Sequence, residues 1–301
     1  MSTNLRQKIQ QLNRLNTENV DYAYIKSLIK EMHKRSSTII LNSGLSNYLY
    51  RVRINPPTKP NCTSELREPS AHYVSGFQRC NIPEQPMFYS ANRRITAILE
   101  CNPVVDDVLY LGQWRVDKRF AFNSIFRPEL LGDIKLNQYD ERLIDYYDTV
   151  FTRHIHSTYS SQYKITAAIT DKLTKRYPPG NDDGFEISEL GNVALSYPSV
   201  VDIEDGHNMV LYPEMVDECL NLAHVMEAQV ISRSGNKVSI EITDNSNVIN
   251  NGVITWSGDP TAVPLDSEGK STIYVSDGNT WRLGVRSESM GERELDNFLC
   301  E

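Results

Sequence analysis

The hydrophobic positions of the first 35 residues recur at the spacing of two amphipathic helices. The two apolar stripes consist of Leu5, Ile9, Leu12 and Leu15, and of Tyr22, Ile25, Leu28, Ile29 and Met32. The polar run at 16–19 separates them and predicts the break between the helices. We expect this helical pair, in an N-terminal extension of residues 1–45, to pack on the body of the protein or on a second subunit.

Residues 46–225 alternate between strand-like and helix-like patterns. Branched and aromatic residues predict strands at 46–54, 87–89, 108–116 and 209–212. Apolar spacing predicts helices at 93–101, 140–153 and 163–176, the first with Asn92 as its N-cap. Prolines predict irregular connections at 55–70 and 178–184. This mixture indicates an α+β fold.

The C-terminal pattern is that of short strands. Val238, Ile240 and Ile242 alternate with polar residues, and the runs 234–236 (Ser-Gly-Asn) and 277–279 (Asp-Gly-Asn) stand where hairpin turns belong. We assign residues 226–301 to a β-rich appendage. It either extends the main sheet or forms a module of its own.

Composition narrows the class of protein. The chain has 301 residues, of which 40% are hydrophobic and 23% charged, and its formal net charge of −8 argues against a nucleic-acid-binding surface. The N-terminus lacks the apolar core of a signal peptide, and no apolar run is long enough to span a membrane. The cysteines are odd in number and widely scattered, which favours reduced thiols. We expect a cytoplasmic protein that binds neither membrane nor nucleic acid.

The segment 79–100 concentrates the candidate chemistry. Arg79 precedes a predicted strand, Tyr89 ends it, and Glu100 follows the apolar stretch 95–99. The planar fork of an arginine binds phosphate or carboxylate, and an aromatic ring offers a face to a base. A carboxylate beside apolar residues is costly without a partner. Taken singly, each residue also fits a structural role, as a surface arginine, a core tyrosine and a helix-terminal glutamate.

The joint spacing of these residues resembles the RES-domain family. The matching positions within the segment are Arg79, Asn81, Pro83, Pro86, Tyr89, Ser90, Ala97 and Glu100. Those outside it are 50–52, 163–166, 183–184, 197–199 and Asn208. The resemblance covers residues 46–215.

Two positions depart from the family pattern. Phe77 and Gln78 stand where the family often has two glycines, and Cys80 replaces the usual tryptophan. The first departure bears on how closely the backbone approaches a ligand, because glycine adopts conformations that glutamine resists. The second removes a large ring that would shape the pocket.

The resemblance implies a fold like that of ADP-ribosyltransferases, with a split β-core, surrounding helices and NAD in the cleft. It implies catalytic roles for Arg79, Tyr89, Glu100 and Ser199. It implies NAD contacts from Arg51, Arg79, Asn81, Tyr89, Ser90 and Ser199. On this interpretation the two arginines hold the pyrophosphate, Tyr89 lines the nicotinamide side and Ser199 fixes the ribose or the amide. Glu100 stabilises the positive charge that develops on the ribose, and no metal takes part.

The resemblance further implies an NAD-degrading toxin that a partner antitoxin restrains. The acceptor is water for a glycohydrolase or inorganic phosphate for a phosphorylase, and the residues do not separate the two. Two alternatives stay open: an ADP-ribosyltransferase that modifies a protein or nucleic acid, and a degenerate RES fold that binds a nucleotide or partner without turnover. Self-association through the added segments also stays open.

Two other polar groups are weaker candidates. His154 and His156 lack a third ligand at a diagnostic spacing, which argues against a metal site. Ser199, His207 and either Asp202 or Asp205 have the residue types of a hydrolase triad. A Gly-x-Ser-x-Gly elbow is absent, however, and these residues crowd one loop.

Overall fold

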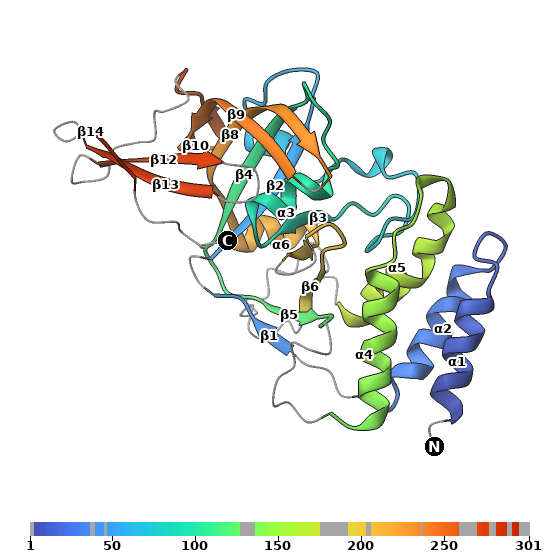
Figure 1. The fold of residues 1–301 in the computed structure, drawn as a ribbon. Helices are drawn as coiled ribbons and strands as arrows, with labels where there is room; N and C mark the ends of the chain where they lie inside the picture. The colour runs from blue at the N-terminus through green and yellow to red at the C-terminus, as the bar shows by residue number, and fades with distance from the viewer. Residues whose placement is uncertain are drawn as a thin grey trace.

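A computed structural model describes residues 3–36, 40–44, 47–126, 136–174, 192–202, 206–235, 237–258, 270–276, 281–287 and 291–294. Helices and a large mixed sheet form the α+β fold that the sequence predicts (Figure 1). Nine described strands form the main sheet, in the order β1-β5-β6-β7-β3-β2-β4-β8-β9. Neighbouring strands are antiparallel except β5 and β6, which are parallel.

The elements have the following bounds. The main sheet contains β1 (Ile40–Asn42), β2 (Tyr48–Ile54), β3 (Phe88–Ala91), β4 (Val108–Val116), β5 (Ala121–Ser124), β6 (Asn192–Pro198), β7 (His207–Leu211), β8 (Leu220–Ser234) and β9 (Lys237–Ser246). The α-helices are α1 (Thr3–Arg14), α2 (Tyr22–His33), α3 (Arg94–Glu100), α4 (Gln138–Phe151), α5 (Tyr163–Leu173) and α6 (Pro213–Cys219). Short 3-10 turns occur at η1 (Thr63–Leu66), η2 (Ala71–Tyr73) and η4 (Ser157–Gln162).

The main sheet is almost divided between β2 and β3. Strand β2 pairs with β4 along its whole length, but it meets β3 only where Tyr50 stands opposite Ala91. One half of the sheet therefore contains β2, β4, β8 and β9, and the other contains β3, β7, β6, β5 and β1. This division agrees with the expected split core, whereas likeness to ADP-ribosyltransferases in particular stays a prediction.

Side-chain alternation gives the first half of the sheet two buried faces. Val52, Leu109 and Met226 belong to a core cluster that includes the apolar side of α3. Leu49 and Tyr110 point to the other face and belong to a larger cluster with residues of α1, α2, α4 and α5. Figure 1 shows these four helices side by side on one flank of the sheet.

The predicted N-terminal helices are confirmed as α1 and α2. Asp21 caps α2 by accepting a hydrogen bond of 2.9 Å from the backbone N–H of Ala23. Leu5, Leu12 and Ile29 are buried in the larger core cluster. Of the two expected arrangements, the structure therefore shows the helical pair packed on the body of the same chain.

The predicted N-cap of α3 is wrong. Arg93 occupies that position, without a side-chain capping bond. Asn92 instead pairs with the end of β7, where its Oδ1 accepts from the backbone N–H of His207 at 2.8 Å. The side chain that would have capped the helix thus satisfies a strand, because β3 and β7 continue side by side beyond Ala91.

The C-terminal strands divide between the main sheet and smaller sheets. Strand β8 runs across position 226, and β9 returns beside it after a turn in which Gly235 has a φ of +60°. These strands thus extend the main sheet. The hairpin of β10 (Val248–Asn250) and β11 (Val253–Thr255) is separate, as is the sheet of β12 (Lys270–Ser276), β13 (Trp281–Ser287) and β14 (Gly291–Glu294). The turn predicted at 277–279 lies outside the described residues.

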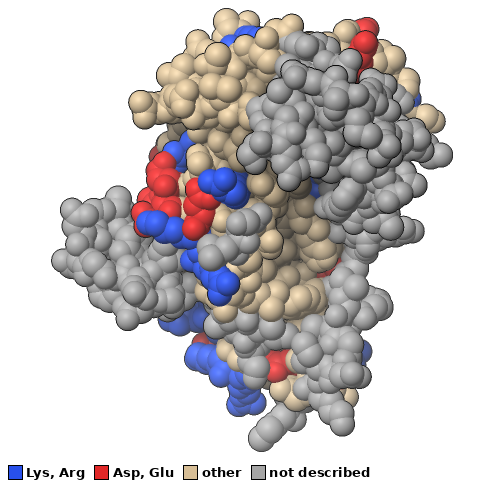
Figure 2. Space-filling model, turned by 90° about the vertical axis from the view of Figure 1, so that its left-hand side faces the viewer, with Lys and Arg blue, Asp and Glu red and all other residues tan. Residues whose placement is uncertain are grey.

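Exposed charges are partly arranged as ion pairs. Arg115 and Asp117 approach to 2.6 Å, and Lys118 bonds to Glu218. The face in Figure 2 shows basic side chains beside acidic ones at one edge, next to a surface of uncharged side chains. Such exposed pairs add little stability, so core packing dominates. Among the described helices, none has the length and hydropathy needed to cross a membrane.

A buried polar cluster lies on the α3 face of the sheet. Arg94 lies 4.8 Å over the ring of Tyr50 and donates to Gln113 at 3.1 Å. His224 is buried nearby on β8, opposite Gln113. Burial, reinforced by the positive charge of Arg94, lowers the pKa of His224 to about 4. The imidazole is therefore neutral in the folded protein at neutral pH.

This pKa predicts how stability depends on pH. Between pH 6.5 and 4 the unfolded chain binds a proton at His224 that the folded chain excludes, so the free energy of unfolding falls as the pH falls. Urea denaturation at several pH values in this range gives the free energy of unfolding as a function of pH. For His224→Gln this free energy should change less steeply with pH than for the wild type, by up to about 1.4 kcal/mol per pH unit. Equal slopes in the two proteins would contradict the prediction.

Candidate functional site

A cavity of about 330 Å³ lies where β2 and β3 diverge. Its walls include Arg51 from β2, Tyr89 and Ser90 from β3, and Glu100 from the end of α3. Arg79 lines it from the turn before β3. The volume is in the usual range for small-molecule sites. Five of the seven site residues predicted from the sequence therefore line one cavity. Asn81 and Ser199 are buried and are not among its lining residues.

The Arg79 guanidinium is held against the end of α4. It donates to the backbone carbonyl of Phe151, and its Nη2 lies 3.4 Å from the carbonyl of Arg153. The ring of Tyr163, at the start of α5, lies 5.5 Å from the guanidinium carbon. The Phe151 carbonyl belongs to the negative end of α4, where a cation is favoured. Arg79 is thus oriented by the protein and still lines the cavity.

Arg51 joins the two halves of the sheet at the cavity. Its Nη1 donates to the carbonyl of Tyr89 at 2.7 Å, and its Nη2 donates to the carbonyl of Arg67 at 3.1 Å. Burial lowers the pKa of this guanidinium from its ordinary value, although an arginine stays charged at neutral pH. Two carbonyls use only part of its five donors, so Arg51 can also bind an anion.

The Tyr89 hydroxyl ties β3 to the turn that carries Arg79. It donates to Oδ1 of Asn81 at 2.6 Å and accepts from the backbone N–H of Cys80 at 2.9 Å. Burial raises the pKa of the Tyr89 phenol well above its ordinary value, so the hydroxyl stays protonated. Asn81, predicted as a ligand contact, lies behind the cavity wall and holds this hydroxyl.

Glu100 presents an exposed carboxylate whose orientation is fixed from behind. Its Oε1 accepts from the Ser199 hydroxyl and from the Asn208 amide, both at 2.7 Å. A negative charge in the last position of a helix opposes the helix dipole, which makes a purely structural role costly. Both bonds converge on Oε1, so the lone pairs of Oε2 are available to a ligand.

The Ser199 hydroxyl is used fully by the protein. It donates to Glu100 and accepts from the backbone N–H groups of Val201 and Asp202, at 3.2 and 3.1 Å. Asp202 in turn forms an ion pair with Arg93 at 3.2 Å and accepts from Thr96. Ser199 therefore positions Glu100 from the loop after β6, and Asp202 attaches this loop to the start of α3. The same bonds give Ser199 and Asp202 partners other than those of a hydrolase triad.

The departures at Phe77, Gln78 and Cys80 leave the turn intact. Neither Phe77 nor Gln78 has a positive φ, so no glycine conformation is needed at these positions. Cys80 is buried in the larger core cluster, and burial raises the pKa of its thiol to about 12. The thiol is thus a protonated core group at neutral pH.

Sequence reasoning did not assign site roles to Asn208 and Tyr163. Asn208 carries an available signal, because it is a polar residue on the same phase of β7 as the buried Val210. Tyr163 lies in the run 163–166 that matches the family, but its own pattern does not predict its place under Arg79, which arises from the packing of α5. Within the described part of the chain, no three His, Cys, Asp or Glu side chains are grouped to hold a metal ion.

A comparison with protein families matches residues 49–230 to the RES domain. The chain belongs to the RES-domain family. This match covers more than half of the sequence and includes every residue of the cavity named above. The family is generally linked to NAD-related toxin function. A search of curated proteins found no match to the chain.

The Tyr89 hydroxyl gives a stability prediction. Tyr89→Phe leaves the Cys80 backbone N–H and the side-chain Oδ1 of Asn81 without this partner, which should lower the free energy of unfolding by about 1–3 kcal/mol. Urea denaturation measures the loss, with Tyr73→Phe as the matched control because Tyr73 is 73% exposed. The same unfolding midpoint in both variants would show that the Tyr89 bonds contribute nothing.

Proposed function

We propose that this RES-domain protein cleaves the bond between nicotinamide and ribose in NAD. The observation that carries the proposal is the Glu100 carboxylate, which is exposed at the cavity and oriented by Ser199 and Asn208. Arg51 and Arg79 line the same cavity and supply positive charge for a pyrophosphate. The family's link to NAD supports this choice of substrate.

The proposed chemistry follows from the charge of Glu100. When the ribose C1–N bond breaks, its electron pair stays on nicotinamide, which leaves as a neutral molecule. Positive charge then develops on the ribose, and a fixed carboxylate stabilises it without having to reorient. An oxygen of water or inorganic phosphate forms the new bond to C1, and a water acceptor releases its proton. The products are ADP-ribose or its 1-phosphate.

The same proposal extends to a biological role as a toxin that depletes NAD, restrained by an antitoxin protein. Its support is the family's association with NAD-related toxins together with the assembled cavity. Transfer of ADP-ribose to a macromolecule and binding without turnover are the alternatives that the experiment must distinguish.

Incubation of the purified protein with NAD, with and without phosphate, tests the proposal. Nicotinamide should appear together with free ADP-ribose, or with the 1-phosphate when phosphate is the acceptor. Label from NAD on protein or nucleic acid would instead identify a transferase. If the folded protein binds NAD but releases no nicotinamide, it is a binding module.

Glu100→Gln is the decisive variant in this assay. Glutamine keeps an oxygen that can accept from Ser199 and Asn208 but lacks the negative charge, so nicotinamide release should fall at least about a hundredfold. Glu141→Gln, an exposed change on α4, serves as the control for loss of a carboxylate. Full activity of Glu100→Gln would overturn the mechanism.

Ser199 yields a kinetic prediction that separates positioning from ligand contact. Because its hydroxyl is buried and bonded within the protein, Ser199→Ala should lower kcat about tenfold and leave KM near the wild-type value. Steady-state kinetics of nicotinamide release measure both parameters, and circular dichroism confirms folding. A raised KM with unchanged kcat would mean that the serine contacts the substrate instead.

A further inference from the structure

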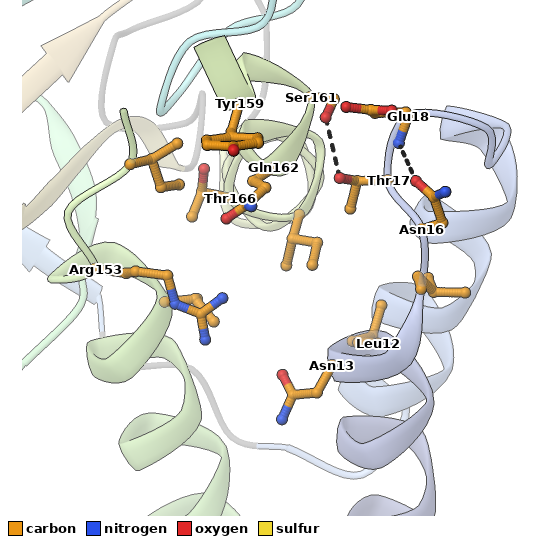
Figure 3. A pocket seen from close by; sticks show the side chains of 14 residues that line it. Leu12, Asn13, Asn16, Thr17, Glu18, Arg153, Tyr159, Ser161, Gln162 and Thr166 are labelled. Carbon is orange, nitrogen blue, oxygen red and sulfur yellow. Dashed lines mark hydrogen bonds between the residues drawn. The ribbon is translucent and has the colours of Figure 1, made fainter. Parts of the chain in front are cut away.

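A second cavity, of about 230 Å³, lies between the end of α1 with its following turn and the α4–α5 connection. Leu12, Asn13 and Thr17 line it from α1 and the following turn. Arg153, Ser161 and Gln162 line it from the other side. Figure 3 shows the Arg153 guanidinium and the Asn13 amide directed into the space between the two sides.

The walls of this cavity are suited to a small polar anion. Among the lining residues Arg153 is the cationic one and Glu18 the acidic one, and both are exposed. Hydroxyl and amide groups also line the cavity, including that of the buried Thr17, whose hydroxyl lies 3.1 Å from the Ser161 hydroxyl (Figure 3). Leu12 and Ile165 form an apolar floor. A guanidinium binds an oxyanion, while the other groups match hydroxyls.

The two cavities share a wall. The carbonyls of Phe151 and Arg153 accept from Arg79 of the first cavity, whereas the Arg153 side chain lines the second. Tyr163 lies under Arg79, and its neighbour Gln162 lines the second cavity. A ligand that fixes Arg153 therefore also restrains one of the two carbonyls that orient Arg79. Coupling of this kind is reciprocal.

We propose that the second cavity binds a small phosphorylated or carboxylated polyol, and that its occupancy stabilises the Arg79 turn. The cavity volume restricts the ligand to a molecule the size of a single sugar or smaller. The ligand carries one phosphate or carboxylate group, which binds the Arg153 guanidinium, and its hydroxyls bond to the polar walls. The binding proposal does not rest on the proposed cleavage of NAD.

Calorimetric titration of the whole protein tests the binding. Ribose 5-phosphate represents the phosphate source and gluconate the carboxylate source, while ribose lacks the anion. We expect saturable binding of at least one anion and none of ribose. Both Arg153→Gln and Asn13→Leu should weaken the binding about tenfold or more.

Arg142→Gln is the matched control, because Arg142 is an exposed arginine of α4 outside this cavity. It should bind as the wild type does. The binding proposal is overturned if neither anion binds, or if Arg153→Gln and Arg142→Gln bind equally well. Glu100→Gln should keep full affinity, which separates this site from the first cavity.

Hydrogen exchange tests the coupling. The backbone N–H of Cys80 donates to Tyr89 inside the Arg79 turn, so its exchange reports the stability of that turn. The anion that binds should slow exchange in residues 77–81 of the wild type, and this effect should be absent in Arg153→Gln. Unchanged exchange at saturating ligand would overturn the coupling.

Discussion

The cavity depends on the way Arg51 holds two separating strands together. Strand β3 pairs with β7 along one edge, but beyond the pair of Tyr50 and Ala91 it has no ladder with β2, so the backbone groups on its β2-facing edge need other partners. The Arg51 guanidinium donates to the Tyr89 carbonyl and thereby bridges the opening. A side chain thus replaces backbone pairing at the point where the sheet divides. The gap in backbone pairing leaves space for a ligand, and the arginine that bridges the gap places a positive charge beside that space.

Buried polar groups behind the cavity wall fix the side chains that line it. Ser199 and Asn208 hold the Glu100 carboxylate, and Asn81 holds the Tyr89 hydroxyl. Each of these supporting groups is buried and has a defined partner, so it resists rotation of the side chain it holds. Orientation is therefore established during folding, before any ligand arrives. This preorganisation is the condition under which a fixed charge stabilises a transition state effectively.

The sequence predicted the long periodic elements and the residues that meet at the cavity. It predicted short strands and contacts between distant residues less well. Strand 108–116 has the predicted bounds, and Arg79, Tyr89 and Glu100 meet at one cavity. Strand β5 has only four residues, too few for a clear period. The bond from Ser199 to Glu100 joins residues 99 positions apart, and only the packing of the loop after β6 on α3 brings them together. Local patterns contain no record of such a contact.

Phe77 shows why a departure from the family pattern is compatible with a formed site. Its ring lies 5.2 Å from that of Tyr22 on α2, and Lys164 of α5 lies 5.6 Å over it. A glycine at this position would leave the turn before Arg79 without side-chain packing, whereas the phenylalanine places it between two helices. The N-terminal helices therefore stabilise the turn that presents Arg79. The structural unit that forms the cavity thus begins before residue 49 and includes α2.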